Sequence, residues 1–266
     1  MPHWLAVIIL GLIEGITEFL PISSTGHLLI PENLGLLPHQ SDLFNVVIQS
    51  GAVLAVLAVF TGRVKQFVTT LGDFTTRDYL GKLGLAFLIT AVGGVAIKKL
   101  HIELPETIPP VAWATLIGGF VILAVEWARK DKTGSPDVTW AVAVAVGFAQ
   151  LLAAVFPGTS RSGASILMAM AIGVARPAAT EFSFLLGVPT LLAAGVFKVL
   201  SALKDGGAAQ EDWAMVGLGL VVSAVSAFLV VKWLIRFVQS HSFNGFAWYR
   251  IVLGAALLIW VFWGKS

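Results

Sequence analysis

The chain has 266 residues, of which 57% are hydrophobic and only 12% are charged. This balance is too apolar for a water-soluble domain of that length and indicates an integral membrane protein. The formal net charge of +2 and the absence of Cys give no sign of a nucleic-acid-binding surface, a disulfide framework or a Cys-ligated metal.

Six stretches of the chain are long and apolar enough to cross a bilayer. A spanning helix needs roughly 20 mainly apolar residues. We therefore expect an all-α, polytopic membrane protein with six spanning helices. The stretches are 43–61, 81–97, 111–128, 182–203, 213–234 and 245–263.

Two further apolar regions have a different pattern. Segments 2–20 and 138–156 each lead into a Pro that is followed by Ser, Thr and Gly. A short apolar stretch follows each of them, at 27–37 and 164–175. Irregular backbone at membrane depth persists only where protein or water satisfies its polar groups. We therefore predict two re-entrant helix–loop–helix hairpins rather than two full spans.

The two hairpins resemble each other in sequence. A shift of 136 residues, the difference between Pro157 and Pro21, brings the two loops and the helices before them into register. Half of the chain therefore looks like a diverged copy of the other half. The matched pairs are Gly11 with Gly147, Glu14 with Gln150, Ser23 with Thr159 and Ser24 with Ser160.

This internal similarity predicts the domain organisation. We expect residues 1–266 to form a single integral membrane domain of two repeats, about 1–128 and about 138–266. If each repeat holds one hairpin and three spans, its odd number of crossings makes the second repeat enter the bilayer from the opposite side. The result would be an inverted-topology repeat with the two loops meeting near the bilayer midplane.

The orientation is predicted from the basic residues. They are more numerous on the side that follows the first, third and fifth spans, which the positive-inside rule makes cytoplasmic. Both termini and the mouth of the first hairpin then lie outside. The residues on the first side are Arg63, Lys65, Arg77, Lys82, Arg129, Lys130, Lys132 and Arg236, and those on the other are Lys98, Lys99, Lys204 and Lys265.

The first hairpin contains a pair of acidic residues, Glu14 and Glu18. Residues four apart share one face of a helix, so the two carboxyl groups should lie close together. Such a pair suits a divalent cation with oxygen ligands, or two carboxyl groups of which one keeps its proton. The alternative is that one Glu only caps a helix or pairs with a distant Arg.

Hydroxyl groups follow this acidic pair. Ser23, Ser24, Thr25 and Gly26 supply hydroxyls and backbone amides in a tight turn that leads into a new helix. The electropositive start of a helix with such groups binds anions, and a phosphate would fit there. An ordinary Ser/Thr cap of the next helix is an equally good reading of the same residues.

His27 and Arg161 are the remaining candidates for chemistry. His27 could act as general acid, general base or nucleophile, or could be a buried, hydrogen-bonded His. Arg161 lies between Ser160 and Ser162, and Gly163 opens the next helix. A guanidinium fork matches phosphate oxygens and neutralises charge during phosphoryl transfer. Arg161 could instead be only the counter-ion of an acidic residue in the first hairpin.

Together these residues supply the parts for transferring or hydrolysing a phosphoryl group with a divalent metal. Because the pocket would lie in the bilayer, its substrate should carry a lipid tail. A lipid-phosphate transporter or flippase without hydrolysis is the alternative, since inverted repeats with broken helices are typical of secondary transporters.

Three ordered motifs closely resemble those of the bacterial undecaprenyl-diphosphate phosphatases, also called bacitracin-resistance proteins. They are EGITEFLPISSTGH from Glu14, PGTSRSGAS from Pro157 and ATEFSFLLGVP from Ala179. The resemblance covers essentially the whole chain. The family's motif positions correspond to Glu14, Glu18, Ser23, Ser24 and His27 in the first motif and to Pro157, Gly158, Ser160, Arg161 and Ser162 in the second, while Ser165 stands where Thr is common.

The resemblance implies that the protein removes the terminal phosphate of undecaprenyl diphosphate, a polyprenyl diphosphate lipid, to recycle the carrier for cell-wall synthesis. It also implies dependence on Mg²⁺ or Ca²⁺ and a site facing outward from the bacterial cytoplasmic membrane. We expect catalysis by Glu14, Glu18, Ser24, His27 and Arg161, with the metal held by the two Glu. We expect substrate binding by Ser23, Thr25, Gly26, Ser160, Ser162 and Gly163.

Two points stay open at this level. The attacking group could be Ser24 activated by His27 or Glu18, His27 itself, or a metal-bound water. The Gly-rich segment 216–221 could pack closely against a second copy of the chain and form a homodimer.

Overall fold

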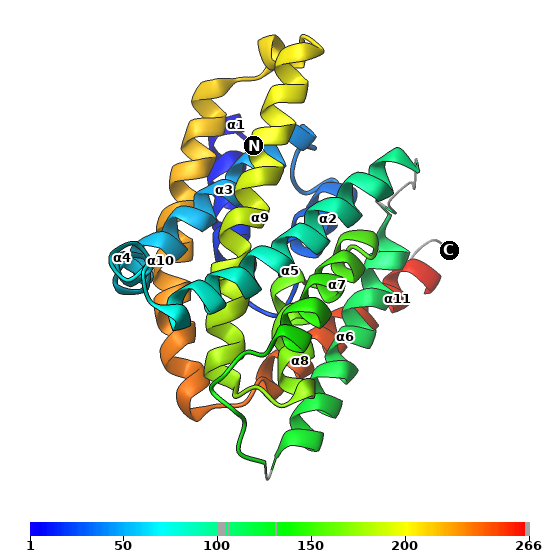
Figure 1. Cartoon of the computed structure of the whole chain (residues 1–266). Helices are drawn as coiled ribbons and strands as arrows, with labels where there is room; N and C mark the ends of the chain where they lie inside the picture. Colours follow the sequence, from blue (N-terminus) through cyan, green and yellow to red (C-terminus); the bar gives the residue numbers. More distant parts are fainter. Residues whose placement is uncertain (101–104, 106, 131, 264–266) are drawn as a thin grey trace.

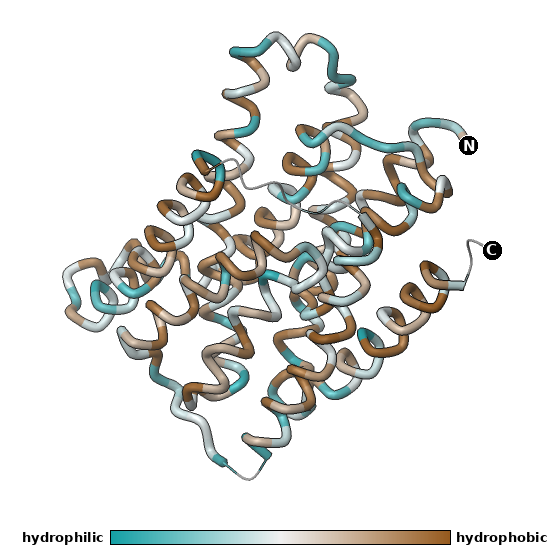
Figure 2. Tube along the Cα trace, turned by 90° about the vertical axis from the view of Figure 1, so that its right-hand side faces the viewer, coloured by the Kyte–Doolittle hydropathy of each residue, from teal (hydrophilic) through white to brown (hydrophobic). Residues whose placement is uncertain are grey.

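The computed structural model describes residues 1–100, 105, 107–130 and 132–263. Within these ranges the chain forms eleven α-helices and one 3₁₀-helix, and the only extended pairing is a single bridge between Ser135 and Val174 (Figure 1). The predicted all-α class is confirmed. In Figure 2 the helices are mostly hydrophobic, and hydrophilic residues gather at their ends and in the loops.

Six of the described helices are long and apolar enough to span a membrane, as the sequence predicts. Their positions match the six predicted stretches. The largest difference is at α5, which begins at Phe74 instead of residue 81, because its first turns are polar and carry no hydropathy signal. The six are α3 (Asp42–Val59), α5 (Phe74–Lys99), α6 (Ile108–Arg129), α9 (Arg176–Lys204), α10 (Trp213–Ser240) and α11 (Asn244–Trp263).

Two pairs of shorter helices occupy the predicted hairpins. The first pair is α1 (His3–Thr17) and α2 (Ser24–Asn33), and the second is α7 (Trp140–Val155) and α8 (Arg161–Ile172). The two helices of each pair pack against each other. Each of the four has 10 to 16 residues, which is shorter than the roughly 20 that a full crossing requires. Their re-entrant position in the bilayer stays a prediction.

Local sequence signals explain several helix ends. The side chains of Ser41, Thr139 and Asp212 cap α3, α7 and α10 by accepting hydrogen bonds from backbone N–H groups. Gly173 ends α8 with a φ of 115°, a conformation that favours glycine. Two short helices, α4 (Thr61–Thr69) and η1 (Gly207–Gln210), were not predicted because they are too short to show a periodic apolar pattern.

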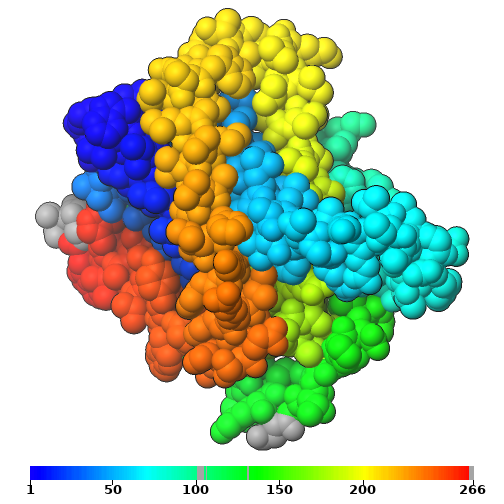
Figure 3. All heavy atoms as spheres, turned by 90° about the vertical axis from the view of Figure 1, so that its left-hand side faces the viewer, coloured from blue at the N-terminus to red at the C-terminus, as the bar shows by residue number. Residues whose placement is uncertain are grey.

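Helices of each half pack against helices of the other half. Helix α1 of the first half packs on α10 of the second, and α7 of the second half packs on α5 of the first. Helix α3 pairs with α9, and α6 pairs with α11. Figure 3 shows α10 lying between α1 and α3 on one face of the molecule. This exchange is the packing that an inverted-topology repeat would produce.

Matched glycines make the exchanged contacts close. A Cβ added to Gly11 of α1 would lie 2.9 Å from the carbonyl oxygen of Gly219 in α10. A Cβ added to Gly147 of α7 would lie 3.0 Å from the carbonyl oxygen of Ala86 in α5. Both glycines therefore allow helix backbones to approach, which is how small residues act in membrane helix packing.

The loops correct one part of the predicted register. Ser23 and Ser160 have φ values of 75° and 73° and are the two non-glycine residues of positive φ in the described ranges. Each accepts a hydrogen bond from the backbone N–H three residues on, at Gly26 and Gly163. Ser23 thus matches Ser160 and not Thr159, so the shift after the turn is 137 and the second loop is one residue longer. Only the helix before each loop keeps the shift of 136.

Gly15 offers a test of the contact between α1 and α10. A Cβ at Gly15 would lie 2.0 Å from Ser226 Oγ and 2.4 Å from the carbonyl oxygen of Ser223. We expect Gly15→Ala to lower the melting temperature of the purified protein in detergent, because overpacking costs typically about 1–3 kcal/mol. Gly217→Ala is the matched control, since nothing lies within 4 Å of a Cβ there. Equal melting of the two variants would contradict this packing.

Candidate active site

The two hairpin loops are in direct contact. The hydroxyls of Ser160 and Ser162, at the start of α8, donate to the carbonyl oxygen of Leu20 in the first loop at 3.3 and 3.0 Å. The first residues of α2 and α8, Ser24 and Arg161, are equivalent in the corrected register. The sequence prediction that the loops of the two halves lie together is therefore confirmed in the structure.

A cavity of about 190 Å³ lies between the loops. A second cavity of about 660 Å³ adjoins it and leads toward the exposed side chains of His39 and Asp42. The two cavities share Thr25, Gln49, Ala153, Ala154 and Pro157. The smaller cavity thus has a route to the protein surface. Its polar lining comes from Glu18, Ser23, Ser24, Thr25, Gln49, Thr90, Gln150, Ser160, Arg161 and Thr190.

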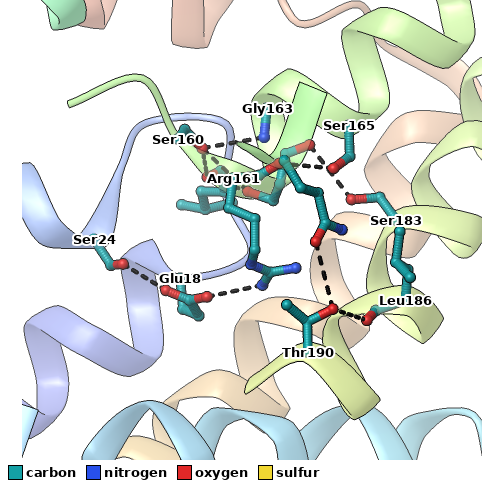
Figure 4. A network of polar contacts seen from close by, with 12 residues as sticks. Glu18, Ser24, Ser160, Arg161, Gly163, Ser165, Ser183, Leu186 and Thr190 are labelled. Atoms are coloured by element: carbon teal, nitrogen blue, oxygen red, sulfur yellow. Dashed lines mark hydrogen bonds and ion pairs between the residues drawn. The ribbon is translucent and has the colours of Figure 1, made fainter. Parts of the chain in front are cut away.

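Glu18 joins the two hairpins. Ser24 Oγ donates to Glu18 Oε2 at 2.5 Å, and Arg161 Nη2 donates to Glu18 Oε1 at 2.8 Å (Figure 4). Glu18 is buried, and the pair with Arg161 is largely screened from solvent. One carboxylate therefore holds a hydroxyl from the first hairpin and a guanidinium from the second.

Arg161 is held so that one arm stays free. Its guanidinium packs on Gly187 of α9, where an added Cβ would lie 2.8 Å from Nη1, and lies 5.7 Å from the ring centroid of Phe19. Nη1 is buried and has no hydrogen-bond partner within the described residues. A buried donor without a partner is costly, so this atom is suited to an acceptor on a ligand.

Glu14 lies one turn before Glu18 and is fully buried. Both of its side-chain oxygens lack a hydrogen-bond partner in the described part of the chain. Glu14 is close enough to Glu18 and Arg161 for their charges to act on its carboxyl group. Free carboxylate oxygens beside a second carboxylate are donors that Mg²⁺ and Ca²⁺ accept.

The carboxylate pair offers few ligands for a metal ion. Among the described residues there is no group of three or more His, Cys, Asp and Glu side chains that could hold a metal ion. Magnesium in particular is often held by one or two carboxylates together with the phosphates of a substrate. The residues present therefore fit a divalent cation whose remaining ligands come from a phosphate group or water.

His27 lies apart from the Glu18 network. Its Nδ1 is 2.6 Å from the carbonyl oxygen of Ser23, and its Nε2 is 2.6 Å from the hydroxyl of Tyr249 in α11. A carbonyl oxygen only accepts, so Nδ1 donates and the neutral ring accepts from Tyr249 through Nε2. His27 is not among the residues that line the smaller cavity. The sequence did not indicate Tyr249 as its partner.

Most of the predicted phosphate-binding hydroxyls also have structural bonds. Ser23 and Ser160 cap α2 and α8, and Ser162 bonds to the first loop. Gly26 and Gly163 donate their backbone N–H groups to these caps. Thr25 is exposed and lines both cavities. Thr25 is therefore the hydroxyl of the first loop with the most freedom to meet a ligand, whereas Ser24 is bonded to Glu18.

Arg250 of α11 is a site residue that the sequence reasoning missed. It is 1% exposed, and all five of its N–H groups donate to backbone carbonyls at 2.8–3.1 Å. A Cβ at Gly118 would lie 1.9 Å from Nη2, so that glycine makes room for it. The available signal was a single Arg in an apolar predicted span, which is costly without a partner. The acceptors are Pro21, Ala114, Thr115, Gly158 and Thr159.

The family model for the bacitracin resistance protein BacA matches residues 7–256. This chain belongs to the BacA family. Among its relatives, proteins named undecaprenyl-diphosphatase are 54% identical over 252 residues in Rhizobium leguminosarum bv. trifolii and 50% identical over 255 residues in Xylella fastidiosa. The first match covers 94% of both chains, and the second covers 96% of this chain and 97% of the relative.

The BacA match, over residues 7–256, includes both hairpin loops and all the residues of the site, from Glu14 to Arg250. The resemblance read from the three motifs is thereby confirmed. The two relatives match along nearly their whole length, so the similarity extends over the whole fold and is not limited to the site.

Arg250 provides a test of how this BacA-family site is held together. We expect Arg250→Met to lower the melting temperature strongly, because each buried carbonyl left without a donor costs about 1–3 kcal/mol. The melting temperature of Arg250→Lys should lie between those of wild type and Arg250→Met, since an ammonium has three donors where the guanidinium has five. Arg236→Met, at an exposed position of α10, is the control. A melting temperature of Arg250→Met equal to that of the control would refute the role.

Proposed function

We propose that this chain is the undecaprenyl-diphosphate phosphatase of its organism: it hydrolyses undecaprenyl diphosphate to undecaprenyl phosphate and inorganic phosphate. Relatives at about 50% identity over nearly the full length bear the name of this activity. The observation that carries the proposal is the bridge that Glu18 makes between Ser24 and Arg161 beside a cavity. This bridge joins a nucleophile (the Ser24 hydroxyl), a base (the Glu18 carboxylate) and a positive charge (the Arg161 guanidinium).

Ser24 is the attacking group that the geometry favours. Its hydroxyl already donates to Glu18, so the carboxylate can take the proton as Ser24 Oγ bonds to the terminal phosphorus. The bond from that phosphorus to the bridging oxygen breaks, undecaprenyl phosphate leaves, and Ser24 becomes a phosphoserine. Glu18 passes the proton that it took to the departing phosphate oxygen and is a carboxylate again. Water then attacks the phosphoserine and gives a proton to Glu18, and this proton returns to Ser24 Oγ as the bond from Oγ to phosphorus breaks and inorganic phosphate leaves.

The two rival attacking groups are less well supported. Both ring nitrogens of His27 are engaged, one with Ser23 and one with Tyr249, and the ring lies outside the cavity lining. Direct attack by water would leave the hydrogen bond between Ser24 and Glu18 without a chemical role. We therefore assign His27 to positioning the first loop against α11.

Arg161 supplies the positive charge for phosphoryl transfer. While Nη2 stays on Glu18, Nη1 is free to donate to a phosphoryl oxygen. A charge-assisted hydrogen bond in a site of low dielectric is worth more than the same bond in water. Arg161 therefore both orients the base and stabilises the charge that develops on the transferred group.

Glu14 and Glu18 would hold a divalent cation, Mg²⁺ or Ca²⁺, between them. When bound, such an ion would offset the negative charge of the diphosphate. The free oxygens of Glu14 support this assignment. Glu18 keeps its bonds to Ser24 and Arg161 in the structure. Glu18 would therefore be both base and metal ligand, while Glu14 would serve only as a metal ligand.

The fold also bears on the setting of the protein. Six apolar helices make this a multi-pass membrane protein, and we propose that its lipid diphosphate substrate comes from the bilayer. We propose a location in the bacterial cytoplasmic membrane with the site facing outward, as the basic residues indicate. We also propose one domain of two inverted repeats, about 1–128 and about 138–266, on the basis of the exchanged helix packing.

Two further readings can be weighed against the structure. A carrier of lipid phosphate without hydrolysis would need no hydroxyl held against a carboxylate, so the bond between Ser24 and Glu18 favours the enzyme.

A homodimer stays a prediction. Within the Gly-rich segment 216–221, Gly219 packs on Phe44 and Ile48 of the same chain, which leaves Gly217 as the glycine that faces open space.

Hydrolysis by the purified protein tests the proposal. We expect phosphate release from undecaprenyl diphosphate in detergent with Mg²⁺, and a loss of at least about 100-fold in kcat for Glu18→Gln, as general-base catalysis contributes 10²–10⁴-fold. Glu32→Gln is the matched control, because Glu32 lies in the same hairpin but lines only the second, larger cavity. No release by well-folded wild type, or full activity of Glu18→Gln, would refute the proposal.

Removal of the metal tests the role of Glu14. We expect chelation to stop phosphate release and added Mg²⁺ or Ca²⁺ to restore it. Glu14→Gln should then need a higher cation concentration for half-maximal activity, because an amide offers one neutral oxygen in place of a charged carboxylate. An unchanged metal titration in Glu14→Gln, with Glu32→Gln as control, would remove Glu14 from the metal site.

A further inference from the structure

Gln150 of α7 occupies the place in the second hairpin that Glu14 of α1 occupies in the first. The two are matched by the shift of 136 that holds for the helices before the loops. Each follows, by three residues, a glycine that packs on a helix of the other half. Gln150 is 1% exposed and Glu14 is 0% exposed. The pseudo-symmetry of the fold therefore sets a buried amide where its partner half has a buried carboxyl group.

The amide of Gln150 has one free donor end. Its Oε1 lies 3.4 Å from Thr190 Oγ1, and the single hydroxyl proton of Thr190 is shared between this oxygen and the closer carbonyl oxygen of Leu186, at 2.7 Å. Its Nε2 is buried and without a hydrogen-bond partner in the described ranges. A buried amide nitrogen left unpaired is costly unless a ligand completes it. Gln150 and Thr190 both line the smaller cavity, so a ligand in that cavity can reach them.

A second free donor borders the same cavity. Arg161 Nη1 is also buried and unpaired in the described part of the chain. No acidic residue of the second hairpin lines the cavity, and Ala154 stands at the position that matches Glu18. The first half thus contributes the carboxylate of Glu18 and the second half contributes N–H donors. A cavity divided in this way suits an anion beside α7 and α8.

We propose that Gln150 is a substrate-binding residue whose Nε2 donates a hydrogen bond to an oxygen of the terminal phosphoryl group, beside Arg161 Nη1. This rests on the proposed phosphatase function, which it deepens by naming a second phosphate-binding side chain. Thr190 is the positioning residue that holds the other end of the amide. On hydrolysis the same two donors retain the inorganic phosphate until it leaves.

The orientation of the amide is the point that a substitution can test. A half-turn about the last side-chain bond would make Nε2 donate to Thr190 and would leave Oε1 free. A free oxygen would favour a cation, whereas a free nitrogen favours a phosphate. Arg161 lines the same cavity and its Nη1 is also unpaired among the described residues, so the donor orientation adds a bond to a shared anion.

Product inhibition by inorganic phosphate measures this subsite without the lipid tail. We expect Gln150→Leu to raise the inhibition constant for phosphate, and the KM for undecaprenyl diphosphate, roughly tenfold or more, as lost bonds to charged groups do. Gln150→Glu should raise both further, because a carboxylate repels phosphate. Thr190→Val should give a smaller rise, since it removes the positioning contact but keeps the donor.

A melting curve separates this role from a structural one. Gln150→Leu removes an unpaired buried polar group, so we expect an unchanged or higher melting temperature together with weaker phosphate binding. A lower melting temperature with an unchanged inhibition constant would show a structural glutamine and overturn the proposal. Gln150→Glu that binds phosphate normally and needs less Mg²⁺ would show that the amide oxygen faces a cation, which would also overturn it.

Calorimetric titration of phosphate into the detergent-solubilised full chain keeps the two proposals separate. If wild type does not hydrolyse the lipid but binds phosphate more tightly than Gln150→Leu does, the phosphatase proposal fails and the subsite stands. If wild type hydrolyses the lipid and Gln150→Leu binds phosphate equally well, only the subsite fails.

Discussion

The two hairpin loops expose backbone carbonyls in an apolar molecule, and the guanidinium of Arg250 donates to those of Pro21, Gly158 and Thr159. Irregular backbone needs such partners wherever water is excluded. Because one side chain bonds to both loops, it also fixes their separation. The positions of Ser24 and Arg161, the first residues after the two loops, depend on this clamp.

Glu18 lies between the two hairpins and bonds to a side chain from each, which brings the groups of the site together. It receives one hydrogen bond from each hairpin, so the hydroxyl and the guanidinium are aligned by a single carboxylate. The corrected register shows how duplication could yield such a site. Ser24 and Arg161 occupy equivalent first positions of α2 and α8, and Glu14 and Gln150 occupy equivalent positions of α1 and α7. The first half carries acidic groups and the Ser24 hydroxyl, whereas the second half carries donors suited to an anion.

The sequence predicts the spans and the polar residues of the site well, because charges and hydroxyls stand out in apolar helices. Glu18, Ser24 and Arg161 were all identified in this way. What it could not predict depends on contacts between distant segments. The bond from His27 to Tyr249 joins residues 222 positions apart, and the five bonds of Arg250 reach three other segments. The extra residue of the second loop is visible only in the backbone geometry.

The most direct measurement is the site of phosphorylation during turnover. Purified protein would be mixed with undecaprenyl diphosphate, quenched in acid and separately in alkali, and digested for mass spectrometry. Attack by Ser24 predicts one added phosphoryl group on that residue, present in wild type and lost in Ser24→Ala. A phosphoryl group on His27, which would survive only the alkaline quench, or continued turnover by Ser24→Ala at the wild-type rate, would contradict it.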